Sequence, residues 1–361
     1  MQNDQMISAF LTGIKGKPHY ARNLVGLAEV ALGRKERLRA FELAHQALRE
    51  ASGDTDVEMR ARALLGSLLP GYHPRMMNDA RRNQAWDRVL RRAVRPGMRV
   101  LEIGTGVGML ALMAARAGAE KVTTCEKDPI AARVAREICE CNGYGNKVEV
   151  VPKKSQDLIP GADLERPADL LFCDIFADTL LGFDPLPALA DARNRLLAPG
   201  APVIPAAGVI KLALARWKNC AIVCRTNYAV GFDIGAFANL VRPSVTLAIG
   251  DADLSLCSQD AEAFRFDFGL PHQPPAGRAE LTLEADRDGV VDGVVQWIRL
   301  ELDTETALEA RPEPGATFFS SPVFWPLPEP VEMRRGNAIG IVAEYSRERL
   351  SIRRSSNNSN K

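Results

Sequence analysis

The sequence has 361 residues, of which 46% are hydrophobic and 25% are charged, and its formal net charge is +1. This composition is typical of a globular protein with two or three domains, large enough to bury a sizeable core. No run reaches the roughly 18 apolar residues that a membrane span needs, and the N-terminal segment lacks the apolar core of a signal peptide, so we expect a soluble cytoplasmic protein with no membrane partner.

The distribution of charge and the spacing of the cysteines indicate which substrates and metals the protein could bind. Residues 1–99 carry a net charge of +8, whereas the remaining 262 residues carry −7. The acidic majority suits a cationic substrate better than a nucleic acid, although ordinary surface scatter explains the same numbers. The seven cysteines have no spacing typical of a zinc site, so we expect reduced thiols and no metal.

Residues 20–69 have the apolar periodicity of helices. One apolar stripe ends at Gly33, a second runs from Leu38 to Leu48, and a third short helix is expected over residues 56–68. Two helices joined at a glycine resemble one tetratricopeptide unit, but a solenoid needs about three stacked units. We therefore expect residues 1–70 to form a helical extension that packs on the next domain.

Strands and helices alternate from Val100 onward, in the order expected for a parallel sheet with helices on both faces. The predicted strands VLEIG, KVTTCE, VEVV and ADLLFCDIF are accompanied by helices over residues 106–117 and 129–141. The alternation ends near residues 198–205, where prolines and a glycine break the pattern. The expected fold class is α/β, with a Rossmann-like domain at residues 71–205.

Residues 206–350 contain short β-branched and aromatic runs separated by turn residues, and no strong helix. This punctuation is typical of an antiparallel sandwich or barrel, and we expect a β-barrel domain here. The final residues, 351–361, are polar and are expected to be disordered.

The most informative motif is VLEIGTGVG at residues 100–108, an apolar strand that runs into three glycines and then a helix. Glycines let the backbone turn tightly and approach a ligand, and the helix N-terminus presents unpaired N–H groups. A nicotinamide-binding loop would need its third glycine at Met109. With Glu102 in front, the loop instead resembles that of class I methyltransferases. Glu126, at the end of the next strand, is placed to accept the ribose hydroxyls of the cofactor.

Further segments resemble the protein arginine methyltransferases over about residues 71–350. Residues 72–86, YHPRMMNDARRNQAW, are similar to that family's M-L-x-D-x-x-R-N-x-x-Y entry helix, and residues 230–237, VGFDIGAF, to the segment that opens its barrel. Residues 293–302 and 329–336 resemble later barrel strands. The resemblance implies methylation of arginine side chains of a cationic protein or peptide, with S-adenosylmethionine as the cofactor and no nucleic acid.

The resemblance also implies which residues hold the cofactor. Arg82 is expected to grip the cofactor carboxylate, for which a guanidinium is suited by its parallel N–H donors. Ser155 and Gln156 fall where the family contacts adenine. The predicted cofactor-binding residues are Arg82, Glu102, Gly104, Thr105, Gly106, Gly108, Glu126, Lys127, Ser155 and Gln156.

The substrate side departs from the family pattern. The family's loop after the fourth strand carries two glutamates about nine residues apart, which hold the guanidinium and orient one nitrogen toward the methyl group. Here Asp174 takes the first place, and Phe183 takes the second, with Asp184 beside it. The family's Thr-His-Trp loop corresponds to residues 318–325, FFSSPVFW, which contain no histidine. We predict Asp174 and Asp184 as the catalytic residues.

Three possibilities remain open for this altered side. The chain methylates arginine with a rebuilt clamp, methylates another group of a peptide or small molecule, or binds the cofactor with little turnover. Asp174, Asp178 and Asp184 could also serve only as loop and helix caps. Residues 206–230 have about the length of the arm through which members of the family pair, so the resemblance further implies a homodimer.

Overall fold

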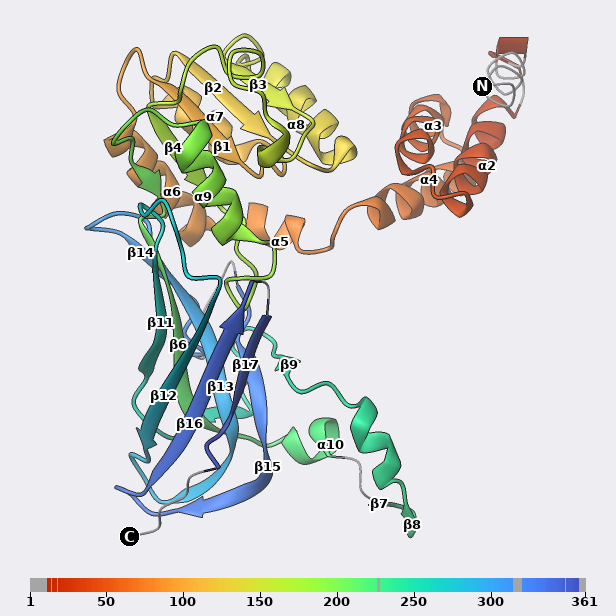
Figure 1. Ribbon diagram of the computed structural model, residues 1–361. Coiled ribbons are helices and arrows are strands. Elements are labelled where there is room, and N and C mark those ends of the chain that lie inside the picture. The colour runs from red at the N-terminus through yellow and green to blue at the C-terminus, as the bar shows by residue number, and fades with distance from the viewer. Residues whose placement is uncertain are drawn as a thin grey trace.

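In a computed structural model of the chain, the described residues are 12–13, 15–17, 19–225, 228–313, 320–347 and 349–356. Figure 1 shows a parallel sheet with its helices above a region of long antiparallel strands, and three N-terminal helices to one side. The candidate site lies in the upper part, on the sheet.

A five-stranded parallel sheet in the order β3-β2-β1-β4-β5 forms the centre of the upper part. Its strands are β1 (Arg99–Ile103), β2 (Lys121–Cys125), β3 (Val148–Val151), β4 (Leu170–Cys173) and β5 (Val203–Ile204). Around it lie α5 (His73–Met77), α6 (Ala80–Ala93), α7 (Met109–Arg116), α8 (Pro129–Cys141), α9 (Pro185–Arg195) and the 3-10 turn η1 (Ser155–Asp157). This is the Rossmann-like arrangement that the sequence predicts. Strand order reverses between β1 and β4, and ligands bind outside the carboxyl ends of the strands at such a point.

Three helices precede the sheet and share one apolar core. They are α2 (Tyr20–Gly33), α3 (Arg37–Glu50) and α4 (Thr55–Leu68). Ile130 of α8 joins this core, so the helices pack directly on the domain with the sheet. The buried face of α3 differs from the predicted stripe, because Leu38 is 39% exposed and the small side chains of Ala40 and Ala44 are buried instead.

The lower part consists of antiparallel strands in two sheets. The larger sheet contains β6 (Ala207–Trp217), β9 (Val245–Thr246), β10 (Leu254–Leu256), β11 (Ala261–Asp267), β13 (Gly289–Glu301), β14 (Ala307–Glu309) and β15 (Val323–Met333). The smaller sheet contains β12 (Ala276–Glu284), β16 (Ala338–Ser346) and β17 (Arg349–Arg354). Pairings among the described residues show no closed barrel. The sheets meet where the Tyr345 ring packs edge-on against Phe264 and Phe266, at 4.8 and 5.1 Å between ring centroids.

Two segments differ from the predicted boundaries. Residues 351–354, expected to be disordered, belong to β17, because their backbone pairs with β16; residues 357–361 lie outside the described residues. The predicted arm at residues 206–230 begins too early, since β6 occupies 207–217 as a central strand of the larger sheet.

The projecting segment follows β6 instead and carries short elements (Figure 1). These are α10 (Cys220–Cys224), β7 (Tyr228–Ala229), β8 (Phe232–Asp233) and the 3-10 turn η2 (Gly235–Leu240). We call the stretch from α10 to η2 the arm segment. Its exposed apolar side chains are Ile222, Val223, Val230, Phe232, Phe237 and Leu240, with 44–97% of their surface accessible. Within the described ranges, no helix is both long and apolar enough to cross a bilayer.

Candidate active site

The glycine loop lies at the carboxyl end of β1, and all three of its glycines have positive φ. A Cβ on Gly104 would lie 2.3 Å from Ile175 Cγ2, so this position excludes a side chain. The Gly104 N–H donates to the carbonyl of Cys125 at 3.0 Å, which fixes the loop against β2. Gly108 is the N-cap of α7. The loop therefore brings backbone N–H groups to the sheet edge where a ligand is expected.

Glu126 follows β2 directly, as predicted, and its carboxylate is bonded to the glycine loop. Its Oε2 accepts a hydrogen bond from the Gly106 N–H at 3.0 Å, and its Oε1 accepts one from the Asp128 N–H at 2.9 Å. Asp128 in turn caps α8. Glu126 thus shapes the loop, in addition to placing a carboxylate at the end of β2.

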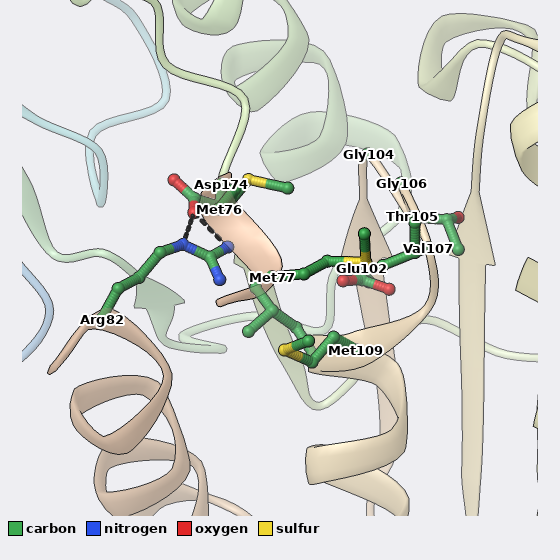
Figure 2. A pocket seen from close by; sticks show the side chains of 11 residues that line it. Met76, Met77, Arg82, Glu102, Gly104, Thr105, Gly106, Val107, Met109 and Asp174 are labelled. Carbon is green, nitrogen blue, oxygen red and sulfur yellow. Dashed lines mark hydrogen bonds and ion pairs between the residues drawn. The ribbon is translucent and has the colours of Figure 1, made fainter. Parts of the chain in front are cut away.

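Arg82 and Asp174 form a buried ion pair across the site (Figure 2). The Arg82 side chain is 4% exposed and that of Asp174 is 8% exposed. Arg82 Nε and Nη2 both donate to Asp174 Oδ2, at 2.8 and 2.5 Å, and Nη1 donates to Asn83 Oδ1 at 2.8 Å. Asp79 caps α6 by accepting from the Arg82 N–H at 3.0 Å, so the first turn of that helix positions the guanidinium.

Glu102 lies in β1 next to the loop and is 1% exposed. Its Oε2 accepts from Thr124 Oγ1 at 2.5 Å, and Thr124 Oγ1 is 2.6 Å from Thr105 Oγ1. Burial raises the pKa of Glu102 to about 8, because a carboxylate loses its hydration there, and the nearby charges of Glu126 and Asp174 act in the same direction. At neutral pH the side chain is therefore mostly a neutral carboxylic acid.

The Arg82–Asp174 pair, Glu102 and the first part of the glycine loop line the cavity whose side chains Figure 2 shows. It is lined by Met76, Met77, Arg82, Glu102, Gly104, Thr105, Gly106, Val107, Met109, Leu110 and Asp174. The three methionines were not predicted from the sequence. Methionine is flexible and polarisable, so they give the cavity adaptable apolar walls. Only their positions in the sequence could have indicated them, because Met76 and Met77 stand shortly before Arg82 and Met109 directly follows the glycine loop.

His73 is another residue that the sequence did not indicate. It is 9% exposed, and its Nδ1 has no hydrogen-bond partner among the described residues. Its Cε1 would lie 3.9 Å from a Cβ on Gly106, so the imidazole is beside the glycine loop. Burial lowers the pKa of His73, which favours the neutral ring. A buried nitrogen without a partner at this place fits a polar ligand on the loop. With the glycine cradle and Arg82, it fits S-adenosylmethionine.

Several predicted cofactor residues lie outside the cavity lining: Gly108, Glu126, Lys127, Ser155 and Gln156. Ser155 is buried in η1, and its Oγ donates to Gln156 Oε1 at 3.2 Å. Lys127 has its Nζ 5.8 Å from the centroid of the Phe183 ring. Glu126 and Lys127 follow β2, and Ser155 and Gln156 follow β3, so these four residues lie along the carboxyl edge of the sheet beyond the cavity.

The clamp loop, residues 174–184, connects β4 to α9 and carries the predicted substrate residues. The structure brings Asp174 to the cavity but not Asp184. Asp184 is the N-cap of α9 with φ 58°, and its carboxylate accepts from Arg347 Nε and Nη2 at 3.0 and 2.6 Å. Asp184 therefore does not line the cavity with Asp174, and its catalytic role stays a prediction. Phe183 is 49% exposed.

Residues 318–325 contact the clamp loop through Ser320 and Ser321. Ser320 Oγ and the Ser321 N–H donate to Asp178 Oδ1 in the clamp loop, at 3.1 and 2.8 Å. Phe318 and Phe319 lie outside the described residues. In the part of the chain that the structure describes, no three His, Cys, Asp or Glu side chains group as metal ligands, and all seven cysteines are free thiols.

Comparisons with known proteins identify the family to which the chain is similar. A family profile described as Ribosomal protein L11 methyltransferase (PrmA) matches residues 86–216. "Arginine N(omega)-methyltransferase" of Streptomyces achromogenes subsp. streptozoticus is 31% identical over 280 residues, which cover 77% of each chain. "Protein arginine N-methyltransferase 7" of Drosophila grimshawi is 32% identical over 284 residues, and the match covers 73% of this chain but 39% of that protein.

Two solved structures share the fold. "Trypanosoma brucei PRMT1 enzyme-prozyme heterotetrameric complex with AdoHcy" has a TM-score of 0.68 and 21% identity, covering 78% of this chain and 91% of that one. The protein arginine methyltransferase 10 of Arabidopsis thaliana has a TM-score of 0.66 and 16% identity, covering 80% and 95%. The sequence match over most of the Streptomyces enzyme decides the family. The chain belongs to the S-adenosylmethionine-dependent arginine methyltransferases, as the sequence motifs predicted.

Proposed function

We propose that this chain transfers a methyl group from S-adenosylmethionine to a guanidinium nitrogen of an arginine side chain in a protein or peptide. The observation that carries the proposal is Asp174, a carboxylate at the end of β4 that lines the cavity. Arg82 donates both of its hydrogen bonds to one oxygen of Asp174, Oδ2, and Asp174 Oδ1 accepts no hydrogen bond among the described residues. That free oxygen suits an N–H of a cationic substrate.

The cofactor supplies an electrophilic methyl group on a sulfonium sulfur. Arg82 would hold its carboxylate, Glu126 its ribose hydroxyls, and the backbone of the glycine loop its amino-acid end, while Ser155 and Gln156 would face adenine. Arginine stays protonated in proteins, so the enzyme must orient a cation rather than deprotonate it first. Asp174 would hold that cation and direct one nitrogen toward the methyl group, which is catalysis by positioning and by a fixed charge.

A second candidate is methylation of arginine as a small molecule. The name of the Streptomyces relative gives arginine without mention of protein, and that relative matches this chain over 77% of its length. The altered clamp loop, with Phe183 half exposed and Asp184 on Arg347, also leaves the substrate class to be decided by experiment.

The decisive assay uses the whole chain, labelled cofactor, and two acceptors in parallel: an arginine-rich peptide and free arginine. Mass mapping of the product to a guanidinium nitrogen of the peptide supports the first candidate, and label in free arginine alone supports the second. Methyl transfer to any other group contradicts both. Binding of S-adenosylhomocysteine without transfer to any acceptor would instead support a cofactor-binding protein with little turnover.

The finer domain organisation is part of the proposal. Residues 1–70 would act as a helical extension, 71–205 as the cofactor domain and 206–350 as a barrel formed by the two antiparallel sheets. The arm segment would pair two copies, because its exposed apolar side chains need cover and large exposed patches mark interaction sites. Light scattering that gives a monomer of 39.4 kDa at working concentration would contradict the homodimer.

A further inference from the structure

The clamp loop is held at both ends by ion pairs. At the start, Asp174 binds Arg82, and at the end, Asp184 binds Arg347. A loop pinned only at its ends keeps freedom at its centre, and the centre determines how the side chains between the pins face a substrate. The contacts of Asp178, midway along the loop, therefore matter for the reaction.

Asp178 joins the centre of the clamp loop to the strand region by three hydrogen bonds. Its Oδ1 accepts from the Ser321 N–H at 2.8 Å and from Ser320 Oγ at 3.1 Å. Its backbone carbonyl accepts from Gln296 Nε2 at 3.0 Å. Ser320 is 3% exposed and Gln296 is fully buried in β13. Buried donors that lose their acceptor are costly, so this connection is tightly specified.

Apolar packing holds the residues that follow. Leu180 and Leu181 are fully buried. A Cβ on Gly208 of β6 would lie 2.6 Å from Leu180 Cδ1 and 2.7 Å from Phe268 Cζ, so the strand keeps a glycine where Leu180 enters. Leu180 itself has φ 71°, a conformation that persists only when the surroundings enforce it. The buried leucines hold the clamp loop against the strands. The hydrogen bonds of Asp178 are directional, so they also fix where the loop lies along those strands.

We propose that Asp178 is a positioning residue for methyl transfer. It fastens the centre of the clamp loop to β13 and to Ser320 and Ser321, which precede β15, and so sets how Asp174 and Phe183 meet the substrate. It does not line the cavity, so it acts through Asp174, four positions earlier. The proposal rests on the methyltransferase function given above. A displacement of about 1 Å at a reacting group can lower a rate by about a hundredfold, which gives such an anchor a kinetic effect.

The test compares Asp178→Ala, which removes the carboxylate that accepts from Ser320 and Ser321 but keeps the carbonyl that accepts from Gln296, with Asp178→Asn, whose amide oxygen can still accept both side-chain bonds. Asp267→Ala is the matched control, because the Asp267 carboxylate accepts from the Gly269 N–H and its carbonyl accepts from Gln273 Nε2, in a turn after β11. Each variant is measured for kcat and KM with an arginine peptide, for affinity and stoichiometry with S-adenosylhomocysteine, and for amide hydrogen exchange of residues 174–184.

We expect Asp178→Ala to lower kcat/KM by about tenfold to a hundredfold, with faster exchange in the clamp loop and full stoichiometry for S-adenosylhomocysteine. Asp178→Asn should stay within about threefold of the parent, and Asp267→Ala should change neither kcat/KM nor clamp-loop exchange. Ser320→Ala should give a smaller loss that adds little to Asp178→Ala, since the two share one bond.

An Asp178→Ala protein with parental kcat/KM would overturn the proposal. A loss of activity that is fully explained by a lower stoichiometry of S-adenosylhomocysteine binding would also overturn it.

If the parent chain methylates no arginine acceptor, the proposed function fails. Hydrogen exchange measured without substrate then tests by itself whether Asp178 anchors the clamp loop. If clamp-loop amides exchange no faster in Asp178→Ala than in the parent, the anchoring role of Asp178 is overturned. Faster clamp-loop exchange in that variant, and not in Asp178→Asn or Asp267→Ala, supports the anchoring role.

Discussion

The two sides of the active site are built differently. On the cofactor side, the decisive groups are bonded to backbone: Glu126 accepts from the glycine loop, and the first turn of α6 sets Arg82. On the substrate side, Phe183 is half exposed and Asp184 binds an exposed arginine. Under the proposed function, the first side holds the cofactor and the second holds the acceptor. In this chain the groups of the first side are fixed by backbone hydrogen bonds, whereas the second side depends on side chains of a loop.

The strongest test of this contrast is Asp174→Asn, because Asp174 belongs to both sides. We expect turnover with an arginine acceptor to fall by at least about a hundredfold, as when one electrostatic stabiliser is lost. Since Arg82 donates twice to Asp174, we also expect weaker binding of S-adenosylhomocysteine. Calorimetry and initial rates measure both, and normal turnover would reduce Asp174 to a loop cap.

Glu126→Ala tests the cofactor side alone. We expect affinity for S-adenosylhomocysteine to fall by about 1–3 kcal/mol, because the Gly106 and Asp128 N–H groups lose their acceptor and the ribose loses its partner. Glu149→Ala is the control, since that carboxylate pairs with Lys121 at 3.0 Å on the surface. Equal calorimetric affinities for the parent and Glu126→Ala would remove Glu126 from the cofactor site.

Glu102→Gln tests whether the buried carboxyl costs stability. The folded state holds the proton of Glu102 up to about pH 8, whereas the unfolded chain loses it near 4.5, the ordinary pKa of a glutamate side chain. Between these values the folded state binds the extra proton, so the free energy of unfolding should fall with rising pH, by at most about 1.4 kcal/mol per pH unit. Glutamine cannot ionise, so the variant should lose this slope. Urea unfolding at pH 5, 7 and 9 measures it, and parallel pH profiles for both proteins would contradict the prediction.

Asp184→Ala should have the smallest effect. Its partner Arg347 is 70% exposed, and exposed ion pairs contribute about 0–1 kcal/mol to stability. Because Asp184 does not line the cavity, we expect kcat and KM with an arginine peptide to stay within about threefold of the parent. If Asp184→Ala lowered turnover as much as Asp174→Asn, Asp184 would be a catalytic residue, and the two sides of the site would not differ as described above.

Much of the cofactor domain could be predicted because local rules govern it. The helix expected at residues 129–141 is α8 to the residue, with Asp128 as its cap and Pro129 in its first turn. The tight turn of the glycine loop and the position of Glu126 at the end of β2 could also be predicted. Only certain residue types suit a tight turn or the end of a strand.

Contacts between residues that are far apart in the sequence could not be predicted, because those residues meet only after folding. The Arg82–Asp174 pair joins positions 92 apart, and the bonds of Asp178 join positions 118 to 143 apart. No local pattern indicates that Asp184 turns toward Arg347, or that Ala40 and Ala44 join Phe41 and Leu43 in the buried face of α3 while Leu38 stays exposed. Apolar periodicity marks a face of the helix, but the neighbouring helices decide which side chains of that face are covered.

The Arg82–Asp174 pair also limits how such an enzyme can acquire a new substrate. A substitution at Asp174 alters the residue that meets the acceptor, and at the same time it strands a buried guanidinium in the cofactor site. Natural variation in acceptor preference should therefore avoid this position. It should accumulate at Phe183 and Asp184, where the side chains are replaceable without loss of the cofactor.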